Sequence, residues 1–108
     1  CQQILPRMKM VGWGRIINMG AQAAINGMPL AGPYCTSKMA VHSLTKIVAL
    51  ENGAGITCNA LVPGIIDTPF NRKQMPDAEH NNWVSPAKIA KKIEGLLLSD
   101  ENGELINL

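Results

Sequence analysis

Short apolar runs alternate along the chain with longer amphipathic stretches. The runs GRIINM at 14–19 and ITCNALV at 56–62 have the length of buried strands, and a third run, ELINL, begins at 104. Between them, apolar residues recur at helical spacing from Tyr34 to Glu51 and from Pro86 to Ser99. The pattern therefore predicts short strands joined by helical crossovers, which is typical of a parallel α/β sheet.

The segments outside these runs carry boundary signals. Residues 1–10 have the pattern of a helix end, and Gly12 is a suitable stop. The stretch 20–33 is rich in glycine, alanine and proline, so we expect a loop there. Residues 65–83 are irregular and of mixed charge, and we expect a long loop of functional importance. Ser85, followed by proline, suits the N-cap of the last helix.

The composition indicates a globular protein. Of 108 residues, 46% are apolar and 17% charged, and the formal net charge is +2. No basic run exceeds two residues, so nothing favours nucleic-acid binding. No segment approaches the roughly 18 unbroken apolar residues of a membrane span. The cysteines form no metal-ligand pattern, so we expect no metal, reduced thiols and a cytoplasmic protein.

A tyrosine and a lysine stand one helical turn apart at the start of the predicted 34–51 helix. Tyr34 and Lys38 share a helix face, and an ammonium beside a phenol favours the phenolate, so the pair could exchange a proton with a substrate. A chance pair without catalytic role is common. This pair, however, follows a predicted strand and a glycine-rich loop, and the next strand ends in PGIIDT at 63–68. Ligands of open parallel sheets bind beyond the carboxyl ends of the strands, where both features are expected.

The chain resembles the C-terminal half of a short-chain dehydrogenase/reductase. GRIINM at 14–19, YCTSK at 34–38 and CNALVPGIIDTP at 58–69 agree with that family in order and spacing. The resemblance implies a Rossmann-like, doubly wound parallel sheet whose N-terminal half is missing here. It implies that residues 1–108 are a partial NAD(P)-binding domain, truncated at the N-terminus and also at the C-terminus. It further implies NAD or NADP as cofactor and a small-molecule substrate.

The resemblance also assigns roles to individual residues. Tyr34 would be the proton donor and acceptor and would also contact the cofactor, and Lys38 would bind the ribose and tune the tyrosine. The segment after the second strand would line the nicotinamide with Pro63, Gly64 and Ile66. The Thr68 hydroxyl would bind the carboxamide of the nicotinamide or a phosphate.

One position departs from the family. A serine usually stands 13 residues before the tyrosine, and this chain has Ala21, which offers no side-chain hydrogen-bond donor to a ketone. The quinonoid dihydropteridine reductase branch also lacks that serine and has runs similar to GAQAA at 20–24, AVH at 40–42 and DTPFNRKQMP at 67–76. The resemblance to that branch implies reduction of a quinonoid pterin, which requires protonation of a ring nitrogen. VPGIID at 62–67 is closer to bacterial-type relatives.

Other roles and residues remain open at this stage. The parent protein could be a ketone or 3-oxoacyl reductase that lost its serine, or the chain could be an inactive piece that acts only in subunit association. The family commonly associates through the helix at Tyr34–Glu51, which implies a homo-oligomer. Ala21, Met28 and Asn71 are candidate substrate contacts, whereas His42 lies over two turns from the tyrosine and is expected to be structural or on the surface.

Overall fold

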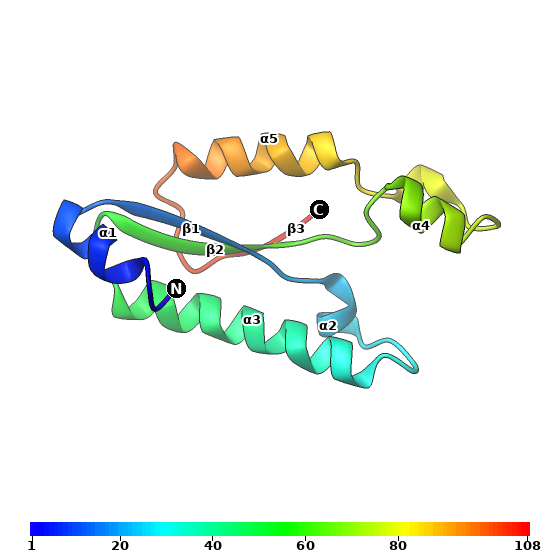
Figure 1. Cartoon of the computed structure of the whole chain (residues 1–108), viewed down its shortest axis with the longest axis horizontal. Helices are drawn as coiled ribbons and strands as arrows, with labels where there is room; N and C mark the ends of the chain where they lie inside the picture. Colours follow the sequence, from blue (N-terminus) through cyan, green and yellow to red (C-terminus); the bar gives the residue numbers. More distant parts are fainter.

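A parallel sheet forms the centre of the computed structural model, which describes all of residues 1–108 (Figure 1). Its three strands lie in the order β1-β2-β3: Gly14–Met19, Ile56–Val62 and Leu105–Asn107. Gly14 lies opposite Ile56, and Ala60 lies opposite Leu105, with all strands parallel. The predicted parallel α/β sheet with crossover helices is thereby confirmed.

One long helix covers each face of the sheet (Figure 1). Helix α3 (Gly32–Glu51) packs on one face, where Val48 and Ala49 contact Cys58 of β2. Helix α5 (Pro86–Leu97) packs on the other face, where the second core cluster consists of Leu61, Val84, Ile89 and Leu96. Every residue of β2 is buried because both faces of this strand are covered. No helix combines the length and apolar character needed to cross a membrane.

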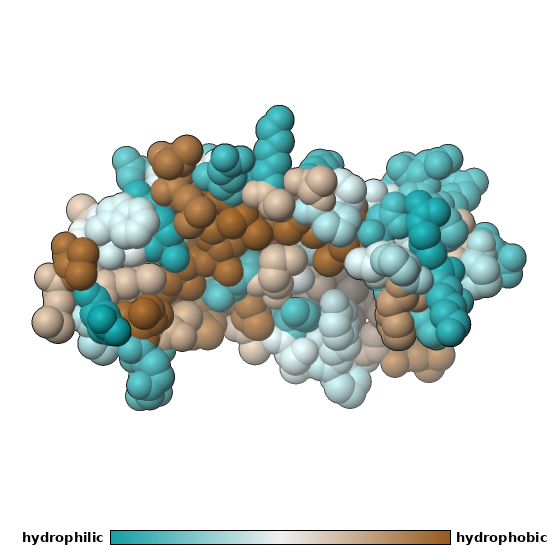
Figure 2. All heavy atoms as spheres, turned by 45° about the horizontal axis from the view of Figure 1, so that its top comes forward, coloured by the Kyte–Doolittle hydropathy of each residue, from teal (hydrophilic) through white to brown (hydrophobic).

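Strand β1 is less buried than its apolar sequence predicts. All but its first residue are half-buried or exposed, because β1 is an edge strand that pairs only with β2. Apolar side chains consequently reach the surface around this part of the molecule, and Figure 2 shows them as a brown band across the middle of the visible face. Exposed apolar surface beside an unpaired strand edge favours pairing with a further strand.

The helix signals in the sequence hold where a cap or a glycine defines them. Helix α1 (Leu5–Val11) ends at Gly12, whose φ of 75° is the left-handed conformation that glycine adopts without strain. Helix α5 begins after Ser85, whose hydroxyl accepts a hydrogen bond from the Lys88 N–H at 3.2 Å. Both predicted boundaries are confirmed.

Two predicted loops contain short helices. The stretch 20–33 contains α2 (Gln22–Asn26), and the stretch 65–83 contains α4 (Pro69–Gln74) and the 3₁₀ turn η1 (His80–Asn82). These helices are shorter than the windows in which periodicity can be recognised. The start of α4 does carry a local signal, because the Thr68 hydroxyl accepts from the Asn71 N–H at 3.2 Å and a proline follows Thr68.

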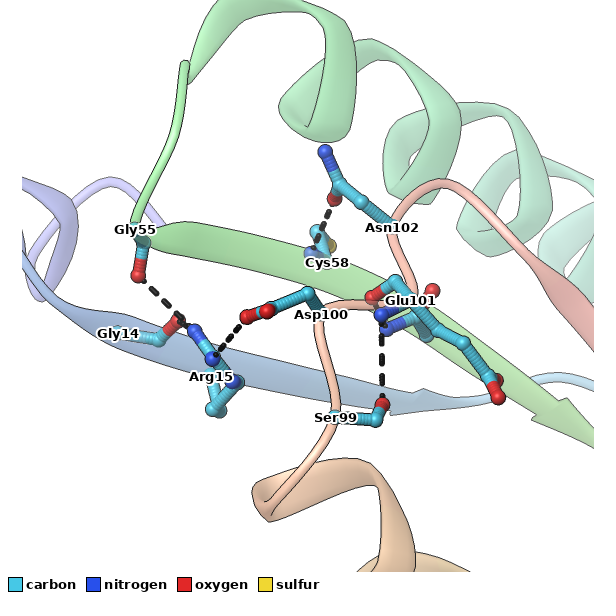
Figure 3. A network of polar contacts seen from close by, with 9 residues as sticks. Gly14, Arg15, Gly55, Cys58, Ser99, Asp100, Glu101 and Asn102 are labelled. Atoms are coloured by element: carbon cyan, nitrogen blue, oxygen red, sulfur yellow. Dashed lines mark hydrogen bonds and ion pairs between the residues drawn. The ribbon is translucent and has the colours of Figure 1, made fainter.

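A polar network closes the amino ends of the strands (Figure 3). The nearly buried Arg15 side chain donates to the carbonyl of Gly55 at 3.0 Å and to the carboxylate of Asp100 at 3.0 Å. Asn102 accepts from the Cys58 N–H at 2.9 Å. These bonds fix the segment leading into β3 against β2, so that the three strands end together at the opposite rim of the sheet.

Candidate active site

A cavity of about 740 Å³ lies at the carboxyl ends of the strands. It is the place that a parallel sheet offers to a ligand. Its walls come from the segment after β1, the start of α3, the segment after β2, and α4. The lining residues are Met19, Gly20, Ala21, Gln22, Ala23, Asn26, Gly27, Met28, Tyr34, Lys38, Pro63, Gly64, Ile65, Ile66, Asn71 and Met75.

Hydrogen bonds between strand ends shape this rim. The Gly20 N–H donates to the Leu61 carbonyl at 2.7 Å, and the Gln22 N–H donates to the Pro63 carbonyl at 3.0 Å. The Gln22 side-chain amide donates to the carbonyl of Leu108, just beyond β3, at 3.3 Å. The segments after all three strands are thus connected, so the cavity wall is fixed by main-chain geometry.

Tyr34 and Lys38 both line the cavity, as their spacing predicts. They lie in the first two turns of α3, which Pro33 helps to begin because its fixed φ suits a first helical turn. Tyr34 is 47% exposed and borders the cavity, so a ligand bound there can contact it. The Lys38 ammonium donates to the carbonyl of Met19 at 3.0 Å and is thereby held at the end of β1.

Three of the four residues after β2 that are predicted to bind the nicotinamide line the same cavity. Pro63, Gly64 and Ile66 are among its lining residues, together with Ile65, which sequence reasoning missed. Thr68 is not among them. Its hydroxyl caps α4 instead, although it accepts there and is left with its own proton to donate.

The candidate substrate contacts Ala21, Met28 and Asn71 also line the cavity. Asn71 is oriented by a 2.8 Å hydrogen bond from its side-chain amide to the Ile66 carbonyl. Sequence reasoning missed two further carboxamides, Gln22 and Asn26. The only signal for them is that they are the polar residues of an otherwise glycine- and alanine-rich segment, which becomes informative once that segment is known to border a cavity.

At the position where the family usually has a serine, the main-chain N–H of Ala21 makes a hydrogen bond to a histidine. Ala21 is buried, and its N–H donates to Nε2 of His42 on α3 at 3.2 Å. His42 is itself only 2% exposed, so the structural role expected for it is confirmed and the surface alternative is wrong. Burial of the ring lowers the pKa of His42, and the charges of Lys38 and Lys46 lower it further. The imidazole is therefore neutral near pH 7.

Three ionisable residues of the 65–83 segment, Asp67, Arg72 and His80, contact one another. Arg72 donates to both carboxylate oxygens of Asp67, including a 2.8 Å bond to Oδ2. These hydrogen bonds hold the pKa of Asp67 below its usual value. The Arg72 side chain also lies 3.4 Å from His80, whose ring packs against Trp83 at 4.4 Å between centroids. This cluster folds the segment beside the cavity, and none of its members lines the cavity.

A parallel sheet with a tyrosine and a lysine at its carboxyl rim is the arrangement expected from the family resemblance, and the comparison with known families agrees. Residues 1–79 match the family described as short chain dehydrogenase. The chain belongs to the short-chain dehydrogenase family, which confirms the resemblance seen in its motifs.

Several individual relatives are similar to this chain. D-beta-hydroxybutyrate dehydrogenase of Rhizobium meliloti is 34% identical over 90 residues, covering 82% of this chain and 35% of the relative. Dihydropteridine reductase of Dictyostelium discoideum is 37% identical over 83 residues, covering 74% of this chain and 36% of the relative. The structure of ElxO with NADP bound superposes with a TM-score of 0.87 at 28% identity, covering 98% of this chain and 49% of that one. The chain thus spans little more than a third of these curated relatives.

Proposed function

We propose that this chain supplies the proton-transfer half of an NAD(P)H-dependent reductase, and that residues 1–108 are part of a larger dinucleotide-binding domain. One observation carries the proposal: Tyr34, Lys38 and the wall at 63–66 line a single cavity at the carboxyl rim of a parallel sheet. The unpaired edge of β1 supports the larger domain, because further strands would pair there.

The residues at this rim fit a nicotinamide dinucleotide. The wall formed by Pro63, Gly64 and Ile66 carries no charge and suits a flat ring. A side chain at Gly64 would come within 3.2 Å of the Gln22 amide oxygen, so glycine keeps this wall open. Pro63, Gly64 and Ile66 would line the nicotinamide and Lys38 would hold the ribose. The Thr68 hydroxyl, just outside the cavity, has a proton to donate to a carboxamide or a phosphate.

The chemistry of the chain's own residues is proton transfer. The substrate would receive its hydride from a reduced nicotinamide bound at this rim. Tyr34 gives its hydroxyl proton to the substrate atom that gains the electron pair, and Lys38, one helical turn further along α3, lines the same cavity. Solvent reaches the half-exposed Tyr34 and restores its proton.

The polar lining favours a neutral heterocycle as substrate. Three of the lining side chains, Gln22, Asn26 and Asn71, are carboxamides, and no carboxylate, guanidinium or imidazole lines the cavity. Carboxamides donate and accept, so they match the lactam and aminopyrimidine edges of a pterin. Protonation of a ring nitrogen by Tyr34 does not require the hydroxyl that Ala21 lacks. The resemblance to dihydropteridine reductase supports the same substrate.

A carboxylate-bearing 3-oxo acid fits this lining less well. Carboxylates are bound most strongly by arginine or another free cation. Lys38 is the one cation that lines the cavity, and the proposal assigns it to the ribose of the cofactor. A ketone or 3-oxoacyl substrate would also have no side-chain donor at Ala21 for its carbonyl.

The substrate assignment is tested with the full-length protein and NADPH or NADH. Cofactor oxidation is followed with a quinonoid dihydropterin, with 3-oxobutyrate and with a 3-oxoacyl thioester. We expect turnover of the pterin well above that of either ketone. Ketone turnover without pterin turnover contradicts the pterin assignment. Absence of any turnover in a protein that binds the cofactor contradicts the reductase assignment itself.

A second proposal concerns association between subunits. Helix α3 exposes four large apolar side chains along its length, which is unfavourable unless another surface covers them: Met39, Leu44, Ile47 and Leu50. We expect a homo-oligomer through the helix at Tyr34–Glu51. Light scattering of the full-length protein should give the molar mass of a dimer or a larger assembly. The Ile47→Glu variant should give a lower molar mass because the assembly dissociates. A wild-type protein that stays monomeric contradicts this association.

A further inference from the structure

The ring of His42 occupies the space left by the missing side chain of Gly20. A Cβ placed on Gly20 would lie only 2.1 Å from Nε2 of His42. The ring is almost fully buried there, and Nε2 accepts the Ala21 N–H at 3.2 Å. Glycine at position 20 and histidine at position 42 are thus complementary, and together they determine the path of the chain as it leaves β1.

The contact lies at the start of a helix that has no side-chain cap. Ala21 is the N-cap residue of α2, and alanine has no side-chain oxygen to accept a hydrogen bond from the helix start. The extended conformation of Ala21 is fixed instead by its own N–H, which His42 binds, and by the N–H of Gln22, which Pro63 binds. Without the hydrogen bond to His42, the Ala21 N–H loses its partner, and the segment that places Gln22 at the cavity is held less firmly.

The bond requires neutral imidazole. Nε2 can accept the Ala21 N–H only while the ring proton is on Nδ1, because a proton on Nε2 would face another donor. The charges that act on the ring are Lys38 and Lys46, both on α3 and both opposed to a second positive charge. The neighbouring segment 20–26 has no titratable group. Strand β2 has only the buried Cys58 thiol, whose raised pKa keeps it uncharged.

We propose that His42 is a positioning residue for the reaction. It holds Ala21 and Gln22 in place as the substrate wall of the cavity, and it does so only in its neutral form. The proposal rests on the reductase function proposed above. It predicts that substrate binding, and not cofactor binding, weakens in acid as His42 gains a proton.

Two matched variants of the full-length protein test this role. His42→Gln places an amide oxygen at about the reach of Nε2 but does not titrate, whereas His42→Leu fills similar volume and accepts no hydrogen bond. We expect kcat/KM for the quinonoid pterin to fall on the acid side for the wild type. In His42→Gln it should stay within about threefold of the wild type at pH 7.5 and lose that acid limb. In His42→Leu it should fall about tenfold through a higher KM, because a hydrogen bond is lost; a tenfold change corresponds to about 1.4 kcal/mol.

Two measurements test the role of His42 independently of the reductase assignment: the affinity for NADPH and the protonation state of the His42 ring. NADPH affinity, measured by fluorescence, should be unchanged in both variants. Nuclear magnetic resonance of the wild-type imidazole should show the Nδ1–H tautomer and a pKa below its ordinary 6.5, and the Ala21 amide should shift as His42 titrates. An Nε2–H tautomer, or an Ala21 amide that ignores the titration, overturns the inference even if no substrate is turned over. If the enzyme is active, wild-type kinetics in a folded His42→Leu protein, or an acid limb that persists in His42→Gln, also overturns it.

Discussion

The main-chain carbonyl of Met19, at the end of β1, accepts a hydrogen bond from Nζ of Lys38 at 3.0 Å. Lys38 is one helical turn after Tyr34 on α3, so this bond joins the helix that carries the proposed acid to the strand end that borders the cavity. The ammonium is therefore fixed on the rim where Pro63 and Gly64 also lie. The position of the charge is set by the fold before any ligand binds.

Replacing Lys38 by methionine should weaken both cofactor binding and turnover. The Lys38→Met side chain keeps similar length but can neither bind the Met19 carbonyl nor hold a ribose hydroxyl. A hydrogen bond from a charged group contributes about 1.5–3 kcal/mol, so we expect kcat/KM to fall by about tenfold or more. Steady-state kinetics and NADPH titration measure the two effects. Lys46→Met, at an exposed position of α3 outside the cavity, is the control and should behave as the wild type at about pH 7.5, where His42 is neutral.

Gly20→Ala should destabilise the protein through His42. The added methyl group overlaps the buried imidazole, and overpacking of this kind costs about 1–3 kcal/mol. The double variant Gly20→Ala/His42→Ala removes the overlap, so its loss of stability in urea should be smaller than the sum of the two single losses. Gly53→Ala, where an added Cβ meets no other atom, is the control. Additive losses would show that the two positions do not share this space.

The ion pair of Asp67 and Arg72 should make stability depend on pH in acid. The pKa of Asp67 is lowered in the folded state by its hydrogen bonds to Arg72, so the unfolded chain binds more protons at this group than the folded protein does. Its contribution is complete above the unfolded pKa of 3.8 and is lost as the pH falls through the lower folded value. We expect Asp67→Asn to melt lower than the wild type at pH 7 and to approach it at pH 2.5. An equal difference at both pH values contradicts this role.

The core beneath α5 should be sensitive to truncation. Leu96 is 1% exposed in the cluster with Leu61, whereas Leu98, just beyond the helix, is 87% exposed. Leu96→Ala should lower the free energy of unfolding by about 2–5 kcal/mol because a cavity remains. Leu98→Ala should change it by less than about 0.5 kcal/mol. Urea unfolding of both variants measures the difference, and equal losses would contradict the packing.

The sequence predicts those parts of the fold that depend on local pattern. The strands at 14–19 and 56–62 are apolar runs between glycines and prolines, and the last helix begins at a serine that caps it. The short helix α2 could not be predicted because its start has no side-chain cap and is held by two long-range hydrogen bonds. They run from the Ala21 N–H to the His42 ring and from the Gln22 N–H to the Pro63 carbonyl. Such long-range bonds leave no periodic signal in the chain.

The residues of the candidate site also divide into those that local sequence predicts and those that depend on long-range packing. Tyr34 and Lys38 could be predicted because helical spacing places them on one face and the family motif assigns them chemistry. Gln22 and Asn26 could not, since their position at the cavity depends on how the segment after β1 folds back. The sequence left a structural and a surface role open for His42, because its contact with Ala21 depends on the packing of α3 against β1.

Turnover by Tyr34→Phe is the most direct test of the central claim, that the Tyr34 hydroxyl provides the proton in this cavity. The variant retains the ring and loses only the hydroxyl, so the cofactor should bind with an affinity close to that of the wild type. In the full-length protein we expect reduction of the quinonoid pterin to slow by about 100-fold or more, the usual contribution of a general acid. Turnover equal to that of the wild type, in a folded variant that binds NADPH normally, would contradict the claim.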